Sequence, residues 1–262
     1  MRVWSALLLG AMTACTPESE IGPERSSSTD LAPDAIQSGY VFLTADTQRL
    51  QDDDFENPGY LWVDRGRALF ETPSATSPAC ASCHSDGLKG VAATYPAIDK
   101  ATGRLLNLEG RINQCRTDHQ DLQVLAYESD DLLALTTYVA NASKGVPQNV
   151  EISERTAPYL EQGRDYFLTR RGQFNLSCQQ CHTESWGKQL RGDTISQGHS
   201  NGFPAYRFEW QSIGSLQRRL RDCNTGVRAE PLPYGDETYI ALELYLAARG
   251  DGLEVEAPAV RR

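Results

Sequence analysis

The sequence predicts an all-α protein of two tandem domains related by an internal duplication, and three repeated features support this prediction. A Cys-x-x-Cys-His motif occurs twice, at residues 80–84 (CASCH) and 178–182 (CQQCH). Each motif follows a similar segment, GRALF at 66–70 and GRDYF at 163–167, and each is followed by an Arg-x-x-x-Cys motif. Repetition of several features in one order indicates two copies of a single structural unit.

Each half is also expected to end in an amphipathic helix, at residues 131–142 and 236–248. Apolar side chains recur in both segments at the spacing of one helix face: Leu132, Leu135 and Val139, then Ile240, Leu244 and Ala248. The predicted domains span residues 38–148 and 149–262, and a chain of 262 residues is long enough for each domain to bury its own core.

The N-terminus has the features of an export signal. Residues 1–15 begin with a basic Met1-Arg2 pair, continue as a short apolar run and end at Cys15. Small residues before Cys15 resemble a lipoprotein signal, in which the cysteine is lipidated, and ordinary cleavage nearby is the alternative. Residues 16–37 are rich in Ser, Pro and Glu and are predicted to form a flexible tether.

The overall charge narrows the classes of partner. The formal net charge is −10, with 23% charged and 40% hydrophobic residues. A negative protein is repelled by nucleic acid and by an anionic membrane surface, so neither is expected as a partner. Beyond the leader, apolar runs are shorter than the roughly 18 residues that a membrane-spanning helix needs.

The Cys-x-x-Cys-His motif is the attachment signature of c-type haem. Its two thiols form thioethers to the haem vinyl groups, and the following imidazole ligates the iron. The sequence therefore predicts two cytochrome c-type domains with two covalently bound haem c groups, held by Cys80, Cys83 and His84 and by Cys178, Cys181 and His182.

The second axial ligand of each iron cannot be methionine, because the only methionines are Met1 and Met12 in the leader. The remaining candidates are a lysine, an open position, or one of four residues: Cys115, Cys223, His119 and His199. Cys115 and Cys223 occupy equivalent places in the two Arg-x-x-x-Cys motifs, so both are predicted as distal thiolate ligands. A Cys115–Cys223 disulfide is the alternative that an oxidising compartment permits. His119, one helical turn from Cys115, could replace it but has no counterpart in the second half.

Positive charge is concentrated around Cys223, where four arginines lie close in sequence: Arg218, Arg219, Arg221 and Arg228. One interpretation is a solvated helix face. The other is a pocket for an oxyanion, because guanidinium groups match tetrahedral anions and would favour the reactive thiolate. An iron, a thiolate and arginines together suit oxidative chemistry on an anionic sulfur compound.

The first half differs, because Arg111 and Arg116 near Cys115 are offset by Asp118 and Asp121. We therefore expect one catalytic site, in the second half, and one relay or vestigial site. The loop between the second haem motif and Cys223 is expected at the mouth of the catalytic site, without individual roles for its residues: Lys188, 202–204 and Arg207. His199 is expected to be a loop histidine.

Four segments resemble one known family: RINQCR at 111–116, NGFP at 201–204, RRLRDCN at 218–224 and VRAE at 227–230. They are similar to the A subunit of the SoxAX cytochromes, the L-cysteine S-thiosulfotransferases of bacterial sulfur oxidation. The resemblance covers about residues 38–260.

The resemblance implies a periplasmic enzyme that couples thiosulfate to a cysteine of the SoxYZ carrier protein, with two electrons leaving through haem. It implies that Cys223 is the active-site cysteine, carried as a persulfide and ligating the second haem. It also implies that Arg219 binds substrate and that Cys115 is the distal ligand of the first haem. The family pairs with SoxX, a small single-haem cytochrome, as a heterodimer. A lipid anchor at Cys15 is not part of the family pattern.

Two other functions are compatible with the haem motifs. A plain dihaem electron-transfer cytochrome would need no arginine-flanked Cys223. A thiosulfate dehydrogenase-type enzyme also uses cysteine ligation, but it would join two thiosulfates and release tetrathionate without a carrier protein.

Overall fold

The computed structural model describes residues 35–262 together with Met1, Leu31 and Ala32. The predicted signal beyond Met1 and most of the predicted tether lie outside the described residues. None of the helices in the described part of the chain is long and apolar enough to cross a membrane.

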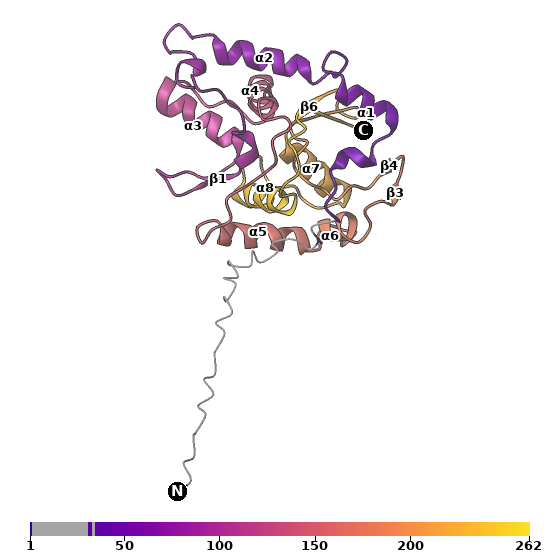
Figure 1. Ribbon diagram of the computed structural model, residues 1–262. Coiled ribbons are helices and arrows are strands. Elements are labelled where there is room, and N and C mark those ends of the chain that lie inside the picture. Colours follow the sequence, from indigo (N-terminus) through magenta and orange to yellow (C-terminus); the bar gives the residue numbers. More distant parts are fainter. Residues whose placement is uncertain (2–30, 33–34) are drawn as a thin grey trace.

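The first half is built on two crossing helices, α2 (Tyr60–Glu71) and α4 (Asp130–Asn141), which lie against each other in Figure 1. Their backbones meet at Gly66, where an added Cβ would lie 2.1 Å from the carbonyl oxygen of Ala134. Phe70, one turn further on, is buried in the same core. The glycine and the phenylalanine of the GRALF segment are therefore the residues that allow this close packing.

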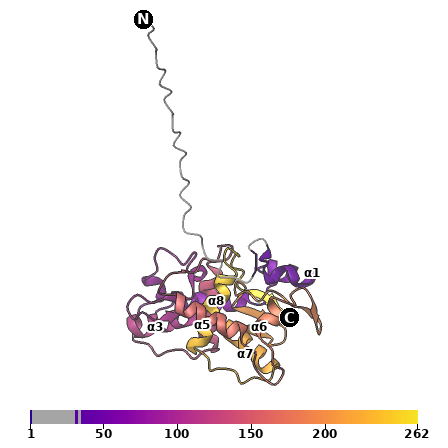
Figure 2. The same cartoon turned by 90° about the horizontal axis from the view of Figure 1, so that it is seen from below.

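The second half repeats this arrangement with α5 (Ala157–Leu168) and α8 (Glu237–Arg249). A Cβ on Gly163 would lie 2.2 Å from the carbonyl oxygen of Ala241, and Phe167 is buried beside it. The expected terminal helices at 131–142 and 236–248 are confirmed, and α4 and α8 each differ from them by one residue at each end. Seen from below, α5 and α6 run across the face of the molecule (Figure 2).

The two cysteine-bearing helices are α3 (Leu108–Gln120), with Cys115, and α7 (Leu216–Gly226), with Cys223. Each begins at a polar N-cap residue. The Asn107 side chain accepts from the backbone N–H of Gly110 at 2.9 Å, and the Ser215 hydroxyl accepts from that of Arg218 at 3.1 Å. The haem motifs lie in η3 (Cys80–Ser82) and α6 (Cys178–His182), and the other helical elements are η2 (Gly39–Phe42), α1 (Ala45–Asp52) and η4 (Ala92–Thr94).

The expectation of an all-α protein needs correction, because three small sheets join the helices. Two are hairpins, β1–β2 and β3–β4, and the third has the order β6-β5-β7, with β6 antiparallel and β7 parallel to β5. Loops at these places satisfy their backbone groups by pairing, which a helical period cannot reveal. The strands are β1 (Ala97–Ile98), β2 (Leu105–Leu106), β3 (Gln189–Leu190), β4 (Asp193–Thr194), β5 (Ala205–Arg207), β6 (Ser212–Gly214) and β7 (Ala259–Arg261).

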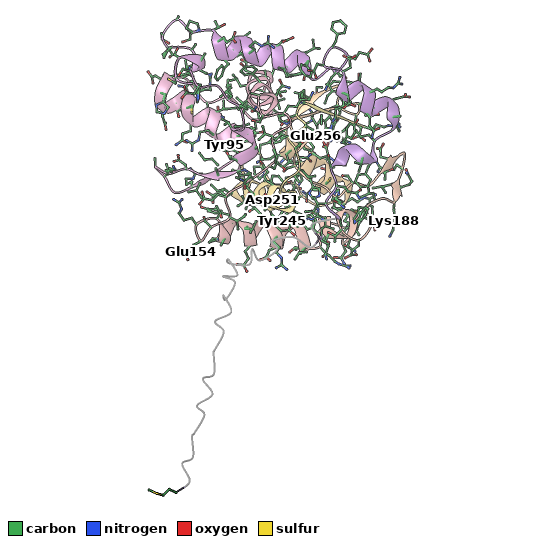
Figure 3. The ribbon with its side chains drawn as sticks, viewed as in Figure 1. Tyr95, Glu154, Lys188, Tyr245, Asp251 and Glu256 are labelled. Atoms are coloured by element: carbon green, nitrogen blue, oxygen red, sulfur yellow. The ribbon has the colours of Figure 1, made fainter. Side chains whose placement is uncertain are left out.

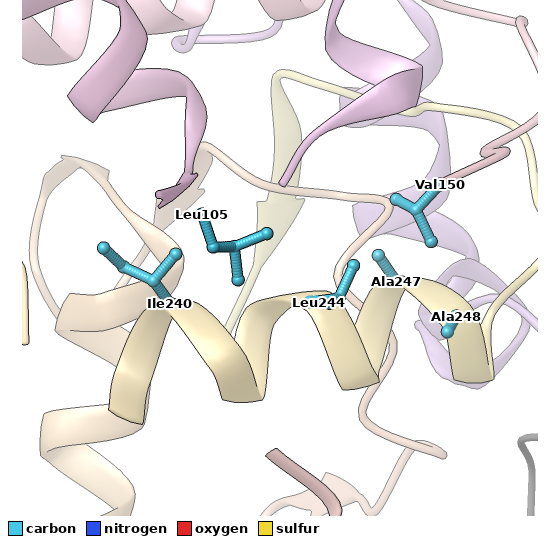
Figure 4. Packing of buried hydrophobic residues seen from close by; sticks show 6 residues of the cluster. All are labelled: Leu105, Val150, Ile240, Leu244, Ala247 and Ala248. Carbon is cyan, nitrogen blue, oxygen red and sulfur yellow. The ribbon is translucent and has the colours of Figure 1, made fainter. Parts of the chain in front are cut away.

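The halves share a core along α8. Its apolar face packs against side chains from the first half and from the connection between the halves, as Figure 4 shows for Leu105, Val150, Ile240, Leu244, Ala247 and Ala248. On the same helix the buried carboxylate of Glu243 accepts from Asn107 Nδ2 at 3.2 Å and from Gln217 Nε2 at 2.7 Å. Since Asn107 caps α3 and Gln217 lies in the first turn of α7, one side chain joins the starts of both cysteine-bearing helices.

The N-terminal part of the described chain lies against the second half. Gln37 donates its backbone N–H to Gln197 Oε1 at 2.8 Å, and Gln197 Nε2 donates back to the carbonyl of Ala35 at 2.7 Å. Further along, Asn57 Nδ2 donates to the carbonyl of Pro258 at 2.9 Å, and α1 packs beside β7 (Figure 1). The two bonds to Gln197 hold its loop, which carries the carbonyl that contacts His182 in the site described below.

Candidate functional site

In the second half the structure brings three cysteines together. Burial raises the pKa of Cys178 to about 11; Arg171 opposes this increase and the charge of Cys223 adds to it. Burial also raises the pKa of Cys181, again with a contribution from Cys223. The predicted attachment cysteines on α6 and the predicted distal ligand on α7 therefore lie within electrostatic reach of one another.

His182, which ends α6, is held with one ring nitrogen turned to the protein. Its Nδ1 lies 2.8 Å from the carbonyl oxygen of Ser196, and because a carbonyl only accepts, Nδ1 carries the hydrogen and Nε2 keeps its lone pair. Burial lowers the pKa of His182 to about 4, and the charges of Arg219 and Arg249 contribute. A neutral imidazole oriented through Nδ1 is the form that ligates haem iron, so these residues fit haem c.

A glycine makes room for that imidazole. Gly198 has φ +76°, and a Cβ there would lie 2.7 Å from Cγ of His182. Any larger residue would push the loop away from the ring and weaken the bond to Ser196. Nothing in the sequence singles out Gly198 or Ser196, since a glycine and a serine in a polar loop carry no specific signal.

Arg249, at the end of α8, contacts both His182 and the loop around Gln197. Its fully buried guanidinium donates to the carbonyl of His182 at 3.1 Å and to Thr183 Oγ1 at 3.0 Å, and also to the carbonyl of Gln197. The guanidinium carbon lies 5.0 Å from the ring centroid of Phe167. Arg249 therefore ties α6 and the loop around Gln197 to the core, a role that its place at a helix end does not reveal in the sequence.

The first half also brings its three cysteines together, but in a more open setting. Burial raises the pKa of Cys115; the charge of Arg111 opposes this, and those of Cys80 and Cys83 add to it. Cys83 and His84 are exposed. The ring of His84 lies 5.8 Å from that of Phe70.

The structure describes three alternatives to Cys115 and Cys223 as distal ligands: a disulfide, His119 and His199. The six described cysteines are all free in this structure, Cys115 and Cys223 among them, so the structure has no disulfide between these two. His119 is exposed at the end of α3. His199 is a buried loop histidine, as expected, with Nε2 3.0 Å from Gln197 Oε1.

The corresponding arginines of the two Arg-x-x-x-Cys motifs have opposite surroundings. Arg111 donates to Tyr95 Oη at 3.0 Å, to Gln114 Oε1 at 2.7 Å and to the buried carboxylate of Asp99 at 2.9 Å. Within the described part of the chain, the guanidinium of Arg219 has no hydrogen-bond or ion-pair partner, and only its backbone N–H is paired, with the carbonyl of Ser215 at 3.4 Å. Its positive charge is therefore available beside Cys223, whereas that of Arg111 is neutralised within the protein.

The expected cluster of four arginines is reduced to Arg219, because the other three have structural partners. Arg218 pairs with Glu128 at 3.8 Å, Arg221 lies over the ring of Tyr234 at 4.5 Å, and Arg228 lies over the ring of Phe174 at 5.0 Å. The interpretation of a solvated helix face is thus wrong for Arg218 and Arg221, which are half-buried in these contacts.

Of the two basic residues singled out in the loop expected at the site mouth, only Arg207 lies near Cys223. Arg207 is buried at the end of β5, where burial and the charge of Arg219 lower its pKa and the charge of Cys223 raises it. Lys188 is exposed and lies at the periphery of the molecule (Figure 3), with Nζ 3.4 Å from the carbonyl of Glu184. Arg207 therefore lies within electrostatic reach of Arg219 and Cys223.

Comparison with known proteins gives a consistent result. Residues 65–148 and 162–255 match the family model described as SoxA/TsdA, cytochrome c domain. The chain is 40% identical over 232 residues to the L-cysteine S-thiosulfotransferase subunit SoxA of Rhodovulum sulfidophilum, covering 87% of this chain and 81% of that protein. The corresponding subunit of Paracoccus pantotrophus is 37% identical over 231 residues, covering 87% and 80%.

Among solved structures, the crystal structure of SoxXA from P. pantotrophus matches with a TM-score of 0.83 at 37% identity, covering 87% of both chains. The fold is thus a helical cytochrome c fold, which carries covalently bound haem c. Family model, sequence relatives and solved structure agree, and the chain belongs to the SoxA/TsdA cytochrome c family.

Proposed function

We propose that this chain is the SoxA subunit of an L-cysteine S-thiosulfotransferase, which couples thiosulfate to a cysteine of a SoxYZ-type carrier protein. The carrier thiol loses its proton, a bond forms between its sulfur and the outer sulfur of thiosulfate, and two electrons leave. Bound haem c would supply the acceptor for those electrons. The names of the relatives and the resemblance of the motifs around Cys223 support this proposal.

Two haem c groups are proposed, one in each half. Cys80, Cys83 and His84 would hold the first, with Cys115 as distal ligand, and Cys178, Cys181 and His182 would hold the second, with Cys223 as distal ligand. The grouping of three cysteines in each half supports this assignment. The matched helix pairs, each packed through the glycine of its GRxxF segment, support an internal duplication with domains at 38–148 and 149–262.

The second half is proposed as the catalytic one, and the guanidinium of Arg219, which has no hydrogen-bond or ion-pair partner among the described residues, is the observation that carries this conclusion. A sulfonate group needs positive donors that the protein has not already neutralised. Arg111, the corresponding arginine of the first half, is neutralised by Asp99 and cannot offer its charge in the same way. Thiosulfate would therefore dock on Arg219, with its outer sulfur directed to the sulfur on Cys223.

The proposed partners are a SoxX-type monohaem cytochrome, which forms the heterodimer, and a SoxYZ-type carrier. The solved SoxXA structure supports the first partner, because its chain covers most of this one at a similar fold. Residues 1–15 are proposed as the export signal to the periplasm and 16–37 as a tether, with Cys15 as the candidate site of a lipid anchor.

The test is to incubate the haem-loaded heterodimer with thiosulfate, the carrier and an oxidised cytochrome, and to measure the mass of the carrier. The proposal expects a mass increase of one thiosulfate on the carrier cysteine. Tetrathionate formed without the carrier, and an unmodified carrier, would instead indicate a thiosulfate dehydrogenase-type enzyme. Electron transfer with neither product would leave a plain dihaem cytochrome.

A further inference from the structure

We infer that Arg207 binds an oxyanion in the Cys223 site, forming with Arg219 a pair of guanidinium groups that face one anion. The inference deepens the proposed function and rests on it for the location of the site. It rests on three observations. The guanidinium of Arg207 is buried, its Nε has no hydrogen-bond partner among the described residues, and the ring of Trp210 connects Arg207 to α7.

The sheet fixes the position of Arg207. The residue ends β5, the central strand, and pairs in register with Ser212 of β6 and with Arg261 of β7. Its side chain is only 8% exposed. A backbone held on both sides leaves the side chain little freedom to reach solvent, so its charge must be compensated where it lies.

That compensation is incomplete within the chain. The guanidinium donates one Nη2 hydrogen to Glu209 Oε2 at 3.1 Å, but the Glu209 side chain is 56% exposed. Nε of Arg207 is buried and has no hydrogen-bond partner among the described residues. Because a buried charged donor without an acceptor is unfavourable, an acceptor from outside the chain is expected at this atom.

Trp210 connects Arg207 to the helix that carries Cys223. The guanidinium carbon of Arg207 lies 5.3 Å from the Trp210 ring centroid, and that of Arg218 lies 4.5 Å from it. Trp210 Nε1 donates to the carboxylate of Asp222, next to Cys223, at 2.8 Å. The indole thus positions the β5–β6 hairpin against α7.

The packing of Trp210 on the β5–β6 hairpin requires a glycine at position 214, since a Cβ there would lie 2.5 Å from Cζ3 of Trp210. The hairpin can therefore approach the indole only with glycine at this position. Burial and the positive charge of Arg219 lower the pKa of Arg207, and an anion bound between the two guanidinium groups would offset their repulsion.

Two oxyanions could supply the missing acceptor, and both present the same chemistry to a guanidinium. One is the sulfonate end of thiosulfate, and the other is a propionate carboxylate of haem bound to this half. The two sources predict different consequences of replacing Arg207, because only the first makes thiosulfate affinity depend on it.

The test compares Arg207→Gln and Arg207→Lys in the haem-loaded heterodimer. Thiosulfate binding is measured by isothermal titration calorimetry without the carrier, and the haem absorption spectra and reduction potentials are measured on the same samples. Arg207→Lys keeps the charge and most of the packing, which guards against a loss that reflects only misfolding. Arg218→Gln is the matched control, because it removes an equal charge that also lies over the Trp210 ring.

For a sulfonate partner, Arg207→Gln should weaken thiosulfate binding by at least about tenfold, Arg207→Lys by less, and Arg218→Gln by less than about threefold. For a propionate partner, thiosulfate affinity stays unchanged while the spectrum or potential of one haem shifts. Unchanged affinity and unchanged haem properties together would overturn the inference. Thiosulfate binding is measured without turnover. If the affinity depends on Arg207 but the protein never modifies the carrier, the inference about Arg207 stands and only the proposed function is refuted.

Discussion

Replacing Glu243 by glutamine should make the stability of this protein less dependent on pH. Glu243 and Glu109 are both buried at the boundary between the halves, and burial raises the pKa of each. The charge of Glu109 adds to the effect on Glu243, and that of Glu128 adds to the effect on Glu109. The two donors to Glu243, from Asn107 and Gln217, favour the charged form but do not reverse the shift.

The magnitude follows from Glu109, whose pKa is raised from 4.5 to about 7. A carboxyl whose pKa is higher in the folded state contributes its full stability below the unfolded value and loses it as pH rises through the folded value. Between about pH 4.5 and about pH 7 the free energy of unfolding should therefore fall by roughly 3 kcal/mol from this group, and Glu243 adds in the same direction.

In Glu243→Gln the amide oxygen can still accept from Asn107 and Gln217, while one titrating group and its repulsion on Glu109 disappear. The decrease in stability between about pH 5 and about pH 8 should shrink by at least ~1.5 kcal/mol. Urea unfolding followed by far-ultraviolet circular dichroism measures this. Exposed Glu154 (Figure 3) provides the control, since Glu154→Gln should keep the wild-type pH dependence. An unchanged slope in Glu243→Gln would refute the reasoning.

Two further predictions concern the helix pair of the second half and the two arginine motifs. Gly163→Ala should lower the free energy of unfolding by about 1–3 kcal/mol, because the new Cβ would overlap the carbonyl of Ala241. Gly226 has open space around it, so Gly226→Ala should change the free energy of unfolding by under ~0.5 kcal/mol in the same unfolding assay. Arg219→Gln should raise the KM for thiosulfate at least about tenfold without destabilising the fold. Arg111→Gln should lower the free energy of unfolding by about 1–3 kcal/mol and leave that KM within about threefold. Equal effects of the two changes on KM would contradict the proposed difference between the two arginines.

Some features could be predicted because their signal is local in the sequence. Haem attachment requires two thiols and an imidazole at fixed spacing, so both haem motifs stand out. The terminal helices follow from apolar residues that recur at the helical period, and α4 and α8 differ from the predicted ranges by one residue at each end. The glycines of the two GRxxF segments stood out as repeats, although only the structure shows that Gly66 and Gly163 are contact points.

Other features depend on residues far apart in the chain. The difference between Arg111 and Arg219 arises from Asp99, which reaches Arg111 through the β1–β2 hairpin, and no pattern in the arginine motifs reveals it. The parallel pairing of β7 with β5 joins residues 259–261 to the loop that carries Arg207. Because these strands are far apart in the chain, the helical periodicity of the sequence does not predict the sheet. Arg249 looked like an ordinary basic residue at a helix end, yet it is fully buried under His182.

The most direct test of the account is the effect of Cys223→Ala on carrier modification, with the haem content of the variant measured by mass spectrometry. The account predicts that the variant keeps both covalent haems, because their attachment uses other cysteines, and that the carrier gains no thiosulfate. Cys115→Ala, prepared in the same way, should still modify the carrier. Carrier modification by a fully haem-loaded Cys223→Ala protein would show that the chemistry lies elsewhere.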